Sequence, residues 1–160
     1  MTLDGVPDVA FRAEMAALFE GAPRFLDRLV AARPFGSWEA LFEAAERIAR
    51  EMPEDEQLEL INAHPRLGAP PSSVSEHSFH EQGYDRDATE AIAELERLNA
   101  AYEEQFGFRY CVFVAGRPRS ALVPELAAAL GRDRASERDR ALHDVIAIAR
   151  DRATKAPLLA

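Results

Sequence analysis

The sequence predicts an all-α fold, a single compact domain of about seven to eight helices over residues 1–160. The chain has 160 residues, of which 48% are hydrophobic, so it is long and apolar enough to bury a core. In most segments the apolar residues recur at the i, i+3, i+4 spacing of an amphipathic helix. Only residues 109–114 (RYCVFV) read as extended. A single strand cannot pair with itself, so we expect an isolated buried segment there rather than a sheet.

Local signals set the ends of the expected helices. Ser37 is placed as the N-cap of the helix with the clearest apolar face. Pro53 is expected in the first turn of the next helix, and Pro65 is expected to end it. Gly107 is placed to end the long helix before the extended run, and Ser136 is placed to cap the last helix. The expected helices cover residues 9–19, 23–31, 38–49, 53–64, 92–106, 122–130 and the chain after 136, with a short helix from Ser78 and a loop over 69–77.

Charge and composition exclude several classes of function. The formal net charge is -9 and no basic stripe stands out, which argues against a nucleic-acid partner. A small anionic substrate stays compatible, because one or two well-placed arginines outweigh a distant acidic surface. Cys111 is the single cysteine, so no intramolecular disulfide can form and a cytoplasmic location is expected. We expect neither a signal peptide nor a membrane partner, since the first residues are not basic and apolar and no apolar run is long enough to span a bilayer.

Residues 64–85 hold the densest group of chemically active side chains. This stretch contains three of the four histidines together with a carboxylate, an amide and hydroxyls, on backbone broken by Pro and Gly. Such a combination on irregular backbone is typical of a site. His64 has two readings, a surface cation that stabilises a helix end or a catalytic group. The tight turn expected from Arg66 and Gly68 places the imidazole on a rim and favours catalysis slightly.

Ser78 and Glu81 fit the Ser-x-x-Glu pattern of a capping box, which is a purely structural role. A carboxylate fixed at a helix N-terminus also suits the orientation of a histidine or of a substrate N–H group. Gln82 both donates and accepts hydrogen bonds, as recognition of a urea or amide requires. A metal site built from His77, His80, Glu81 and Asp85 is the weaker alternative. Its spacing matches no established ligand motif, so no metal is expected.

Three further candidate residues lie outside this stretch. Cys111 lies in an apolar run and is interpreted as a core residue. Arg150 and Arg152 lie near the end of the last helix, where cations complement the helix dipole. Both flank the apolar face, and periodicity does not decide which one reaches inward.

Four ordered motifs carry a resemblance to a known family. They lie at residues 62–68 (NAHPRLG), 78–85 (SxxEQGxD), 98–108 (LNxxYxxxFGF) and 148–152 (IAxxR). With this set the chain resembles the ureidoimidazoline decarboxylases, which convert 2-oxo-4-hydroxy-4-carboxy-5-ureidoimidazoline (OHCU) to allantoin in uric acid breakdown. The resemblance covers most of the chain.

The resemblance implies a cofactor-free carboxy-lyase with an all-α fold that forms a homodimer. It implies that His64 and Glu81 are catalytic. Its implied partner is the small anionic ureidoimidazoline. The residues that it implies for substrate binding are Ser78, Gln82, Arg152, Pro65, Cys111, Val112, Phe113 and Val114.

The sequence departs from the family near the expected pocket. Arg66 stands where family members often have Asp, and the loop over 69–77 is shorter and rich in proline. A related lyase that acts on another ureido or hydroxy acid is therefore an alternative. A third reading is a helical interaction module without enzymatic activity, in which His64 and Glu81 only end helices. The four motifs together favour an enzyme over this module.

Overall fold

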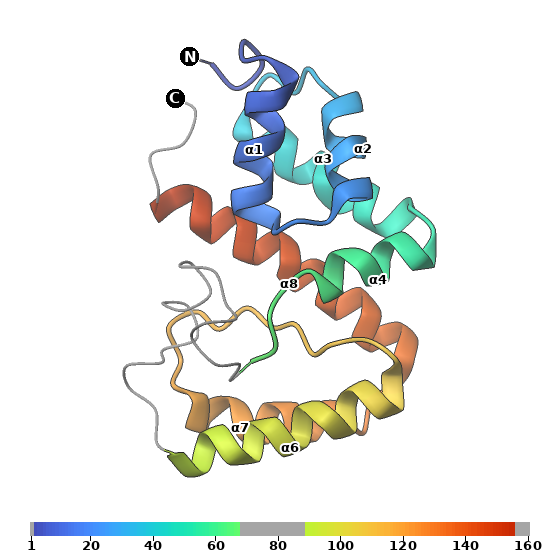
Figure 1. Cartoon of the computed structure of the whole chain (residues 1–160), viewed down its shortest axis with the longest axis vertical. Helices are drawn as coiled ribbons and strands as arrows, with labels where there is room; N and C mark the ends of the chain where they lie inside the picture. Colours follow the sequence, from blue (N-terminus) through green and yellow to red (C-terminus); the bar gives the residue numbers. More distant parts are fainter. Residues whose placement is uncertain (1, 68–88, 156–160) are drawn as a thin grey trace. The chain divides into compact units, whose positions relative to one another are not determined.

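The computed structural model describes residues 2–67 and 89–155. Within this part of the chain there are seven helices and no strand, as the all-α prediction requires (Figure 1). The helices are α1 (Asp8–Phe19), α2 (Pro23–Ala31), α3 (Trp38–Glu51), α4 (Glu54–Asn62), α6 (Thr89–Phe106), α7 (Arg119–Ala129) and α8 (Arg134–Lys155). The chain divides into two compact units, Met1–His64 with Leu142–Ala160, and Pro65–Ala141. The expectation of a single domain over residues 1–160 stays a prediction.

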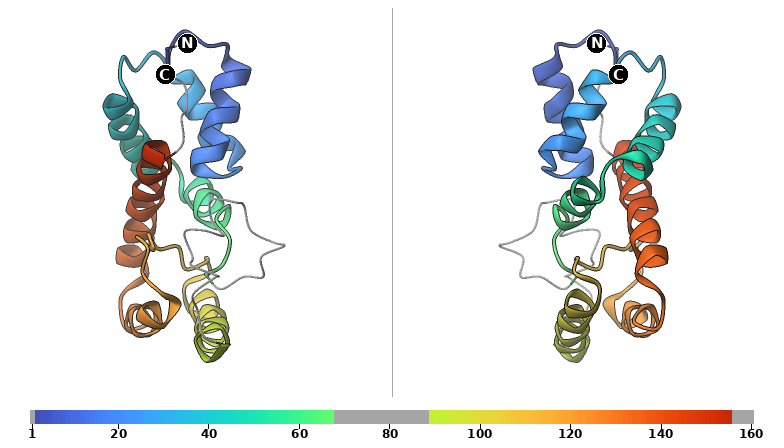
Figure 2. Two further views of the ribbon diagram at one scale, coloured as in Figure 1. Left: turned by 90° about the vertical axis from the view of Figure 1, so that its left-hand side faces the viewer. Right: turned by 90° about the vertical axis from the view of Figure 1, so that its right-hand side faces the viewer.

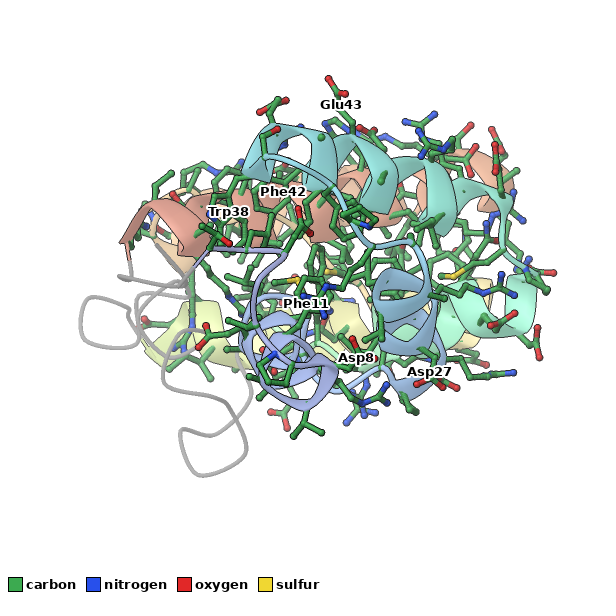
Figure 3. All side chains as sticks on the ribbon, turned by 90° about the horizontal axis from the view of Figure 1, so that it is seen from above. Asp8, Phe11, Asp27, Trp38, Phe42 and Glu43 are labelled. Atoms are coloured by element: carbon green, nitrogen blue, oxygen red, sulfur yellow. The ribbon has the colours of Figure 1, made fainter. Side chains whose placement is uncertain are left out.

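The first unit is built on aromatic packing between its N-terminal helices. Helix α1 lies beside α2 in Figures 1 and 2, and Phe19 meets Phe25 edge to face with ring centroids 5.1 Å apart. Phe11 is fully buried and lies among the helices in Figure 3, whereas the exposed Glu43 points away from α3. Trp38 and Phe42 stack at 6.0 Å along α3. This unit holds the ends of α1 and α4 on which the candidate site is built.

The second unit packs α6 against α7, which lie side by side in Figure 2. Tyr102 of α6 is its aromatic centre, with ring centroids 4.5 Å from Phe106 and 5.1 Å from Tyr110. Gly107 ends α6 with a positive φ of 80°, and its N–H donates to the carbonyl of Glu103. The predicted end of this helix is therefore confirmed. Residues 109–114 carry no strand, as expected for an isolated extended segment.

The starts of three helices test the capping predictions. The Ser37 side chain accepts a hydrogen bond from the N–H of Ala40 at 3.1 Å, so this N-cap is confirmed. Pro53 is the N-cap residue of α4, one position before its expected place in the first turn. Ser136 does not begin α8, because the carboxylate of Asp133 accepts both its N–H and its hydroxyl, at 2.9 and 2.8 Å. The last helix therefore begins at Arg134, because of these two similarly good N-cap residues it is Asp133 whose carboxylate accepts the hydrogen bonds.

Candidate active site

His64 lies just after α4, which ends at Asn62 ahead of Pro65. Its side chain is not on a rim, because the residue is only 4% exposed. The expectation of a rim position was wrong, because the local sequence indicates where a helix ends but not which residues pack against that end. His64 is thus a buried titratable group, the kind that structural and catalytic sites share.

The hydrogen bond of the imidazole fixes its tautomer. Nδ1 lies 3.1 Å from the carbonyl oxygen of Leu60, one turn back in α4. A carbonyl only accepts, so Nδ1 carries the proton, and Nε2 holds the lone pair of the neutral ring. The structure therefore directs the basic nitrogen of His64 away from the α4 backbone.

Arg152 of α8 is the second buried group of the site, with 1% of the residue exposed. Its Nη1 donates to the carbonyls of Ala17 and Leu18 at 3.3 and 3.0 Å. These carbonyls belong to the last turn of α1, where the helix leaves its acceptors without helical partners. Arg152 therefore caps α1 from another part of the chain.

Glu20 completes the group directly after α1. Its Oε1 accepts from Nη2 of Arg152 at 3.1 Å, and its side chain is 17% exposed. Sequence reasoning missed this residue. The motif set begins at residue 62, and Glu20 is a lone acidic residue before Gly21.

Burial and charge set the protonation state of His64. Burial, reinforced by the positive charge of Arg152, lowers the pKa of His64 from 6.5 to about 4. The Glu20 carboxylate and the Leu60 carbonyl oppose this shift without cancelling it. His64 is therefore neutral near pH 7 and able to accept a proton at Nε2.

Arg150 has a different environment from Arg152. Its Nη1 donates to both oxygens of Glu39, at 3.0 and 2.8 Å, and its guanidinium lies 5.0 Å from the centre of the Phe42 ring. The side chain is 38% exposed. Of the two arginines, it is Arg152 that lies buried with its charge acting on His64, and Arg150 forms a surface ion pair.

The extended segment Cys111–Val114 lies in the second unit, where two arginines hold its backbone. Nη1 of Arg140 donates to the carbonyl of Cys111 at 2.9 Å. Arg117 donates to the carbonyls of Phe113 and Val114, at 2.7 and 2.9 Å. Cys111 and Val114 are buried, as expected for the core reading of the cysteine, whereas Val112 and Phe113 are half-buried.

A buried carboxylate orients Arg140 in turn. Glu137 is fully buried and accepts from the Tyr102 hydroxyl at 2.8 Å and from Nη2 of Arg140 at 3.0 Å. Burial opposes the ionised form of Glu137, but these hydrogen bonds outweigh it and hold its pKa below the usual value. The segment Cys111–Val114 is therefore a rigid part of its own unit, and its role in substrate binding stays a prediction.

The described residues of the first motif that follow His64 lie in the second unit. Pro65 is half-buried, and Asn99 donates to the carbonyl of Leu67 at 2.6 Å. Arg66 donates to both carboxylate oxygens of Glu103, from Nε at 2.8 Å and from Nη2 at 3.0 Å. The positive charge of Arg66, which departs from the family pattern, is thus neutralised by a bidentate ion pair with Glu103.

The second motif lies outside the described residues. Ser78, Glu81 and Gln82 belong to it, as do the ligand candidates His77, His80 and Asp85 of the metal alternative. Over residues 2–67 and 89–155, no group of three or more His, Cys, Asp or Glu side chains is arranged to hold a metal ion. In the same part of the chain, no helix is long and apolar enough to cross a membrane.

The fold and this site define an all-α protein with a neutral, buried histidine beside a buried arginine. A family model described as OHCU decarboxylase matches residues 4–154. The chain therefore belongs to the OHCU decarboxylase family, as its motifs indicate.

Individual relatives agree with this family. The chain is 31% identical over 141 residues to the uric acid degradation bifunctional protein PucL of Bacillus subtilis (strain 168), a match over 86% of this chain and 28% of that protein. It is 28% identical over 145 residues to a 2-oxo-4-hydroxy-4-carboxy-5-ureidoimidazoline decarboxylase of Haloferax volcanii, over 89% of this chain and 86% of that one. The chain thus matches about a quarter of the length of PucL and most of the length of the Haloferax protein.

The fold matches that of solved structures. A crystal structure of OHCU decarboxylase in the presence of (S)-allantoin superposes with a TM-score of 0.74 at 24% identity, over 94% of this chain and 97% of that chain. A crystal structure of (S)-allantoin synthase gives 0.69 at 20% identity, over 97% and 54%. At this level of identity the likeness establishes the all-α fold.

Proposed function

We propose that the chain decarboxylates 2-oxo-4-hydroxy-4-carboxy-5-ureidoimidazoline to (S)-allantoin and CO2, as part of uric acid degradation. The observation that carries this proposal is the neutral, buried His64 next to the charge of Arg152, in a member of the OHCU decarboxylase family. Ureidoimidazoline has a carboxylate and a hydroxyl, and these two side chains supply a positive charge for the one and a base for the other.

His64 acts as a general base in the proposed mechanism. Its Nε2 takes the proton of the substrate hydroxyl, because Nδ1 already donates to Leu60. Sequence alone left this step open between proton removal from the hydroxyl and polarisation of the carboxylate. The lowered pKa keeps the ring neutral near pH 7, which is the protonation state that a general base needs.

Loss of CO2 breaks the bond between C4 and the carboxylate carbon and leaves its electron pair in the ring. Fixed hydrogen-bond donors stabilise that developing negative charge, so no electron-accepting cofactor is required. Protonated His64 then returns its proton to one face of the ring, which sets the configuration of the product, and solvent supplies the second proton that neutral allantoin requires. Arg152 supplies the positive charge that holds the anionic substrate.

The remaining site residues keep the roles that the family resemblance implies. We propose that Glu81 takes part in catalysis, and that Ser78 and Gln82 bind the ureido group. Pro65 and the segment Cys111–Val114 complete the binding of the substrate. The match of the family model over 4–154 spans residues of both units, which supports one working domain.

We further propose a cytoplasmic location, in keeping with the single cysteine, and a homodimer, as the family resemblance implies. The alternative of a lyase for another ureido or hydroxy acid rested on Arg66 and on the loop over 69–77. The loop lies outside the described residues, and the pairing of Arg66 with Glu103 gives no reason for a different substrate. The proposed substrate therefore remains OHCU.

The stereochemistry of the product tests this proposal. Freshly generated OHCU decays without enzyme to racemic allantoin, so circular dichroism of the product distinguishes catalysis from decay. We expect the chain to accelerate the reaction and to give an excess of (S)-allantoin. Racemic product formed at the uncatalysed rate contradicts the proposed function.

A further inference from the structure

Glu20 has a backbone conformation that its residue type strongly disfavours. Its φ of 63° and ψ of -168° place it in the region that is essentially restricted to glycine, directly after the end of α1. Gly21 follows at once but is not among the glycines with positive φ. The glycine is thus one position too late to relieve the strain. Such strain persists where the surrounding structure holds the residue in place, and it is concentrated at functional sites.

The side chain of Glu20 shows what this conformation achieves. Its carboxylate is mostly buried and pairs with Nη2 of Arg152 at 3.1 Å, while Nη1 of the same guanidinium binds the carbonyls of Ala17 and Leu18. The two Nη1 hydrogen bonds by themselves cap α1. The Glu20 contact is not needed for that capping. It fixes the rotation of the guanidinium plane and offsets a buried positive charge.

Glu20 also bears on His64 through its charge. The Arg152 guanidinium acts on the imidazole from α8, the Glu20 carboxylate acts on it from the end of α1, and the Leu60 carbonyl acts on it from α4. The carboxylate therefore limits how strongly the nearby positive charge disfavours a proton on the ring. Its removal changes both the orientation of Arg152 and the charge balance beside His64.

We propose that Glu20 is a positioning residue of the active site, which orients the Arg152 guanidinium toward the anionic substrate and balances its charge next to His64. The strained backbone at residue 20 is the structural cost of placing this carboxylate there. This inference rests on the proposed function, since it assigns Arg152 to substrate binding.

The test compares two ion pairs on the same helix. Glu20→Gln keeps the size and an acceptor oxygen but removes the charge, and Glu39→Gln is its control on the exposed partner of Arg150. We expect kcat/KM for OHCU to fall about 10-fold in Glu20→Gln and to stay at the wild-type value in Glu39→Gln. The loss should fall mainly on KM, because the substrate charge that Arg152 holds is already present before the reaction.

Two further variants separate positioning from a merely structural role. Glu20→Gly relieves the backbone conformation, so the protein should fold, and its kcat/KM should fall about 100-fold because the carboxylate is absent. Combining Glu20→Gln with Arg152→Lys should cost little more than Arg152→Lys alone, since Glu20 acts through Arg152. Additive losses, or wild-type kcat/KM in Glu20→Gly, overturn the inference.

Turnover by the wild type distinguishes failure of this inference from failure of the proposed function. A wild-type protein without turnover contradicts the function itself. If the wild type does turn over OHCU, the KM values of the wild type, Glu20→Gln and Glu39→Gln for OHCU test the positioning role alone, because OHCU carries the carboxylate that Arg152 is proposed to hold. A KM that rises in Glu20→Gln and not in Glu39→Gln supports the inference, and equal KM values in the three proteins overturn it.

Discussion

Acidification from pH 7 to pH 5 should destabilise the first unit through His64. In the unfolded chain the imidazole has its ordinary pKa of 6.5, whereas in the folded protein burial and Arg152 lower the pKa to about 4. Between these two values the unfolded chain binds a proton that the folded protein does not. The contribution of neutral His64 to the free energy of unfolding is therefore fully present above pH 6.5. It decreases as the pH falls toward 4.

The magnitude follows from the size of this shift. A difference between 6.5 and about 4 corresponds to about 3 kcal/mol over the whole window, and about 2 kcal/mol of it is lost by pH 5. Solvent screening does not weaken this electrostatic effect, since His64 is only 4% exposed. With a urea dependence of about 2 kcal/mol per molar, the midpoint of unfolding should move down by about 1 M.

Trp38 makes the assay specific to this unit. It is the single tryptophan of the chain and lies on α3, in the unit that contains His64. Its fluorescence during urea titration at pH 7 and pH 5 reports unfolding of this unit in the wild type and in His64→Asn. Other groups titrate equally in both proteins, so the difference between them isolates the histidine.

The control variant is His143→Asn, which removes a histidine whose side chain is 62% exposed. We expect His64→Asn to lose most of the pH dependence between 7 and 5, and His143→Asn to retain it. Equal pH dependence in the wild type and His64→Asn would refute a neutral, buried His64 in the folded protein.

Three further predictions concern the proposed chemistry. Arg152→Lys keeps the charge but loses the planar guanidinium, so kcat/KM should fall by an amount equivalent to about 1.5–3 kcal/mol of transition-state stabilisation. Arg150→Lys should leave kcat/KM nearly unchanged. Steady-state kinetics that give the reverse order would make Arg150 the residue that binds the substrate anion. Glu81→Gln should abolish most turnover with little change in thermal midpoint, since Gln also serves in a capping box, and near-normal turnover would leave Glu81 as a cap only. EDTA treatment should leave the rate unchanged and elemental analysis should find no bound metal, whereas zinc or iron that restores an inactive apo-protein would return His77 and His80 to the ligand set.

Local sequence signals predicted those parts of the fold that depend on neighbouring residues. Ser37 caps α3 and Gly107 ends α6 because a hydroxyl and a missing side chain act within one helical turn. The start of α8 was misplaced because Asp133 and Ser136 both suit capping, and their competition is decided by geometry. Where two neighbouring residues are equally good N-caps, the local sequence therefore does not determine which of them begins the helix.

The site shows a different limit. Arg150 and Arg152 have the same sequence signature, and only tertiary packing makes one exposed and the other buried. The burial of His64 depends likewise on packing over the end of α4. Glu20 carried no usable signal, because its conformation is one that sequence statistics assign to glycine. Side chains that meet across more than 100 positions of sequence, such as Glu20 and Arg152, need the fold itself.

The most direct test of the proposed mechanism is the turnover of His64→Asn with OHCU. The Asn amide can still donate to the Leu60 carbonyl but has no basic nitrogen, so the fold should survive near pH 7.5 while general base catalysis is lost. We predict that kcat falls roughly 100- to 10,000-fold and that the excess of (S)-allantoin disappears, with a thermal midpoint close to that of the wild type. A folded His64→Asn protein that keeps half of the wild-type kcat and the same product configuration would contradict the account.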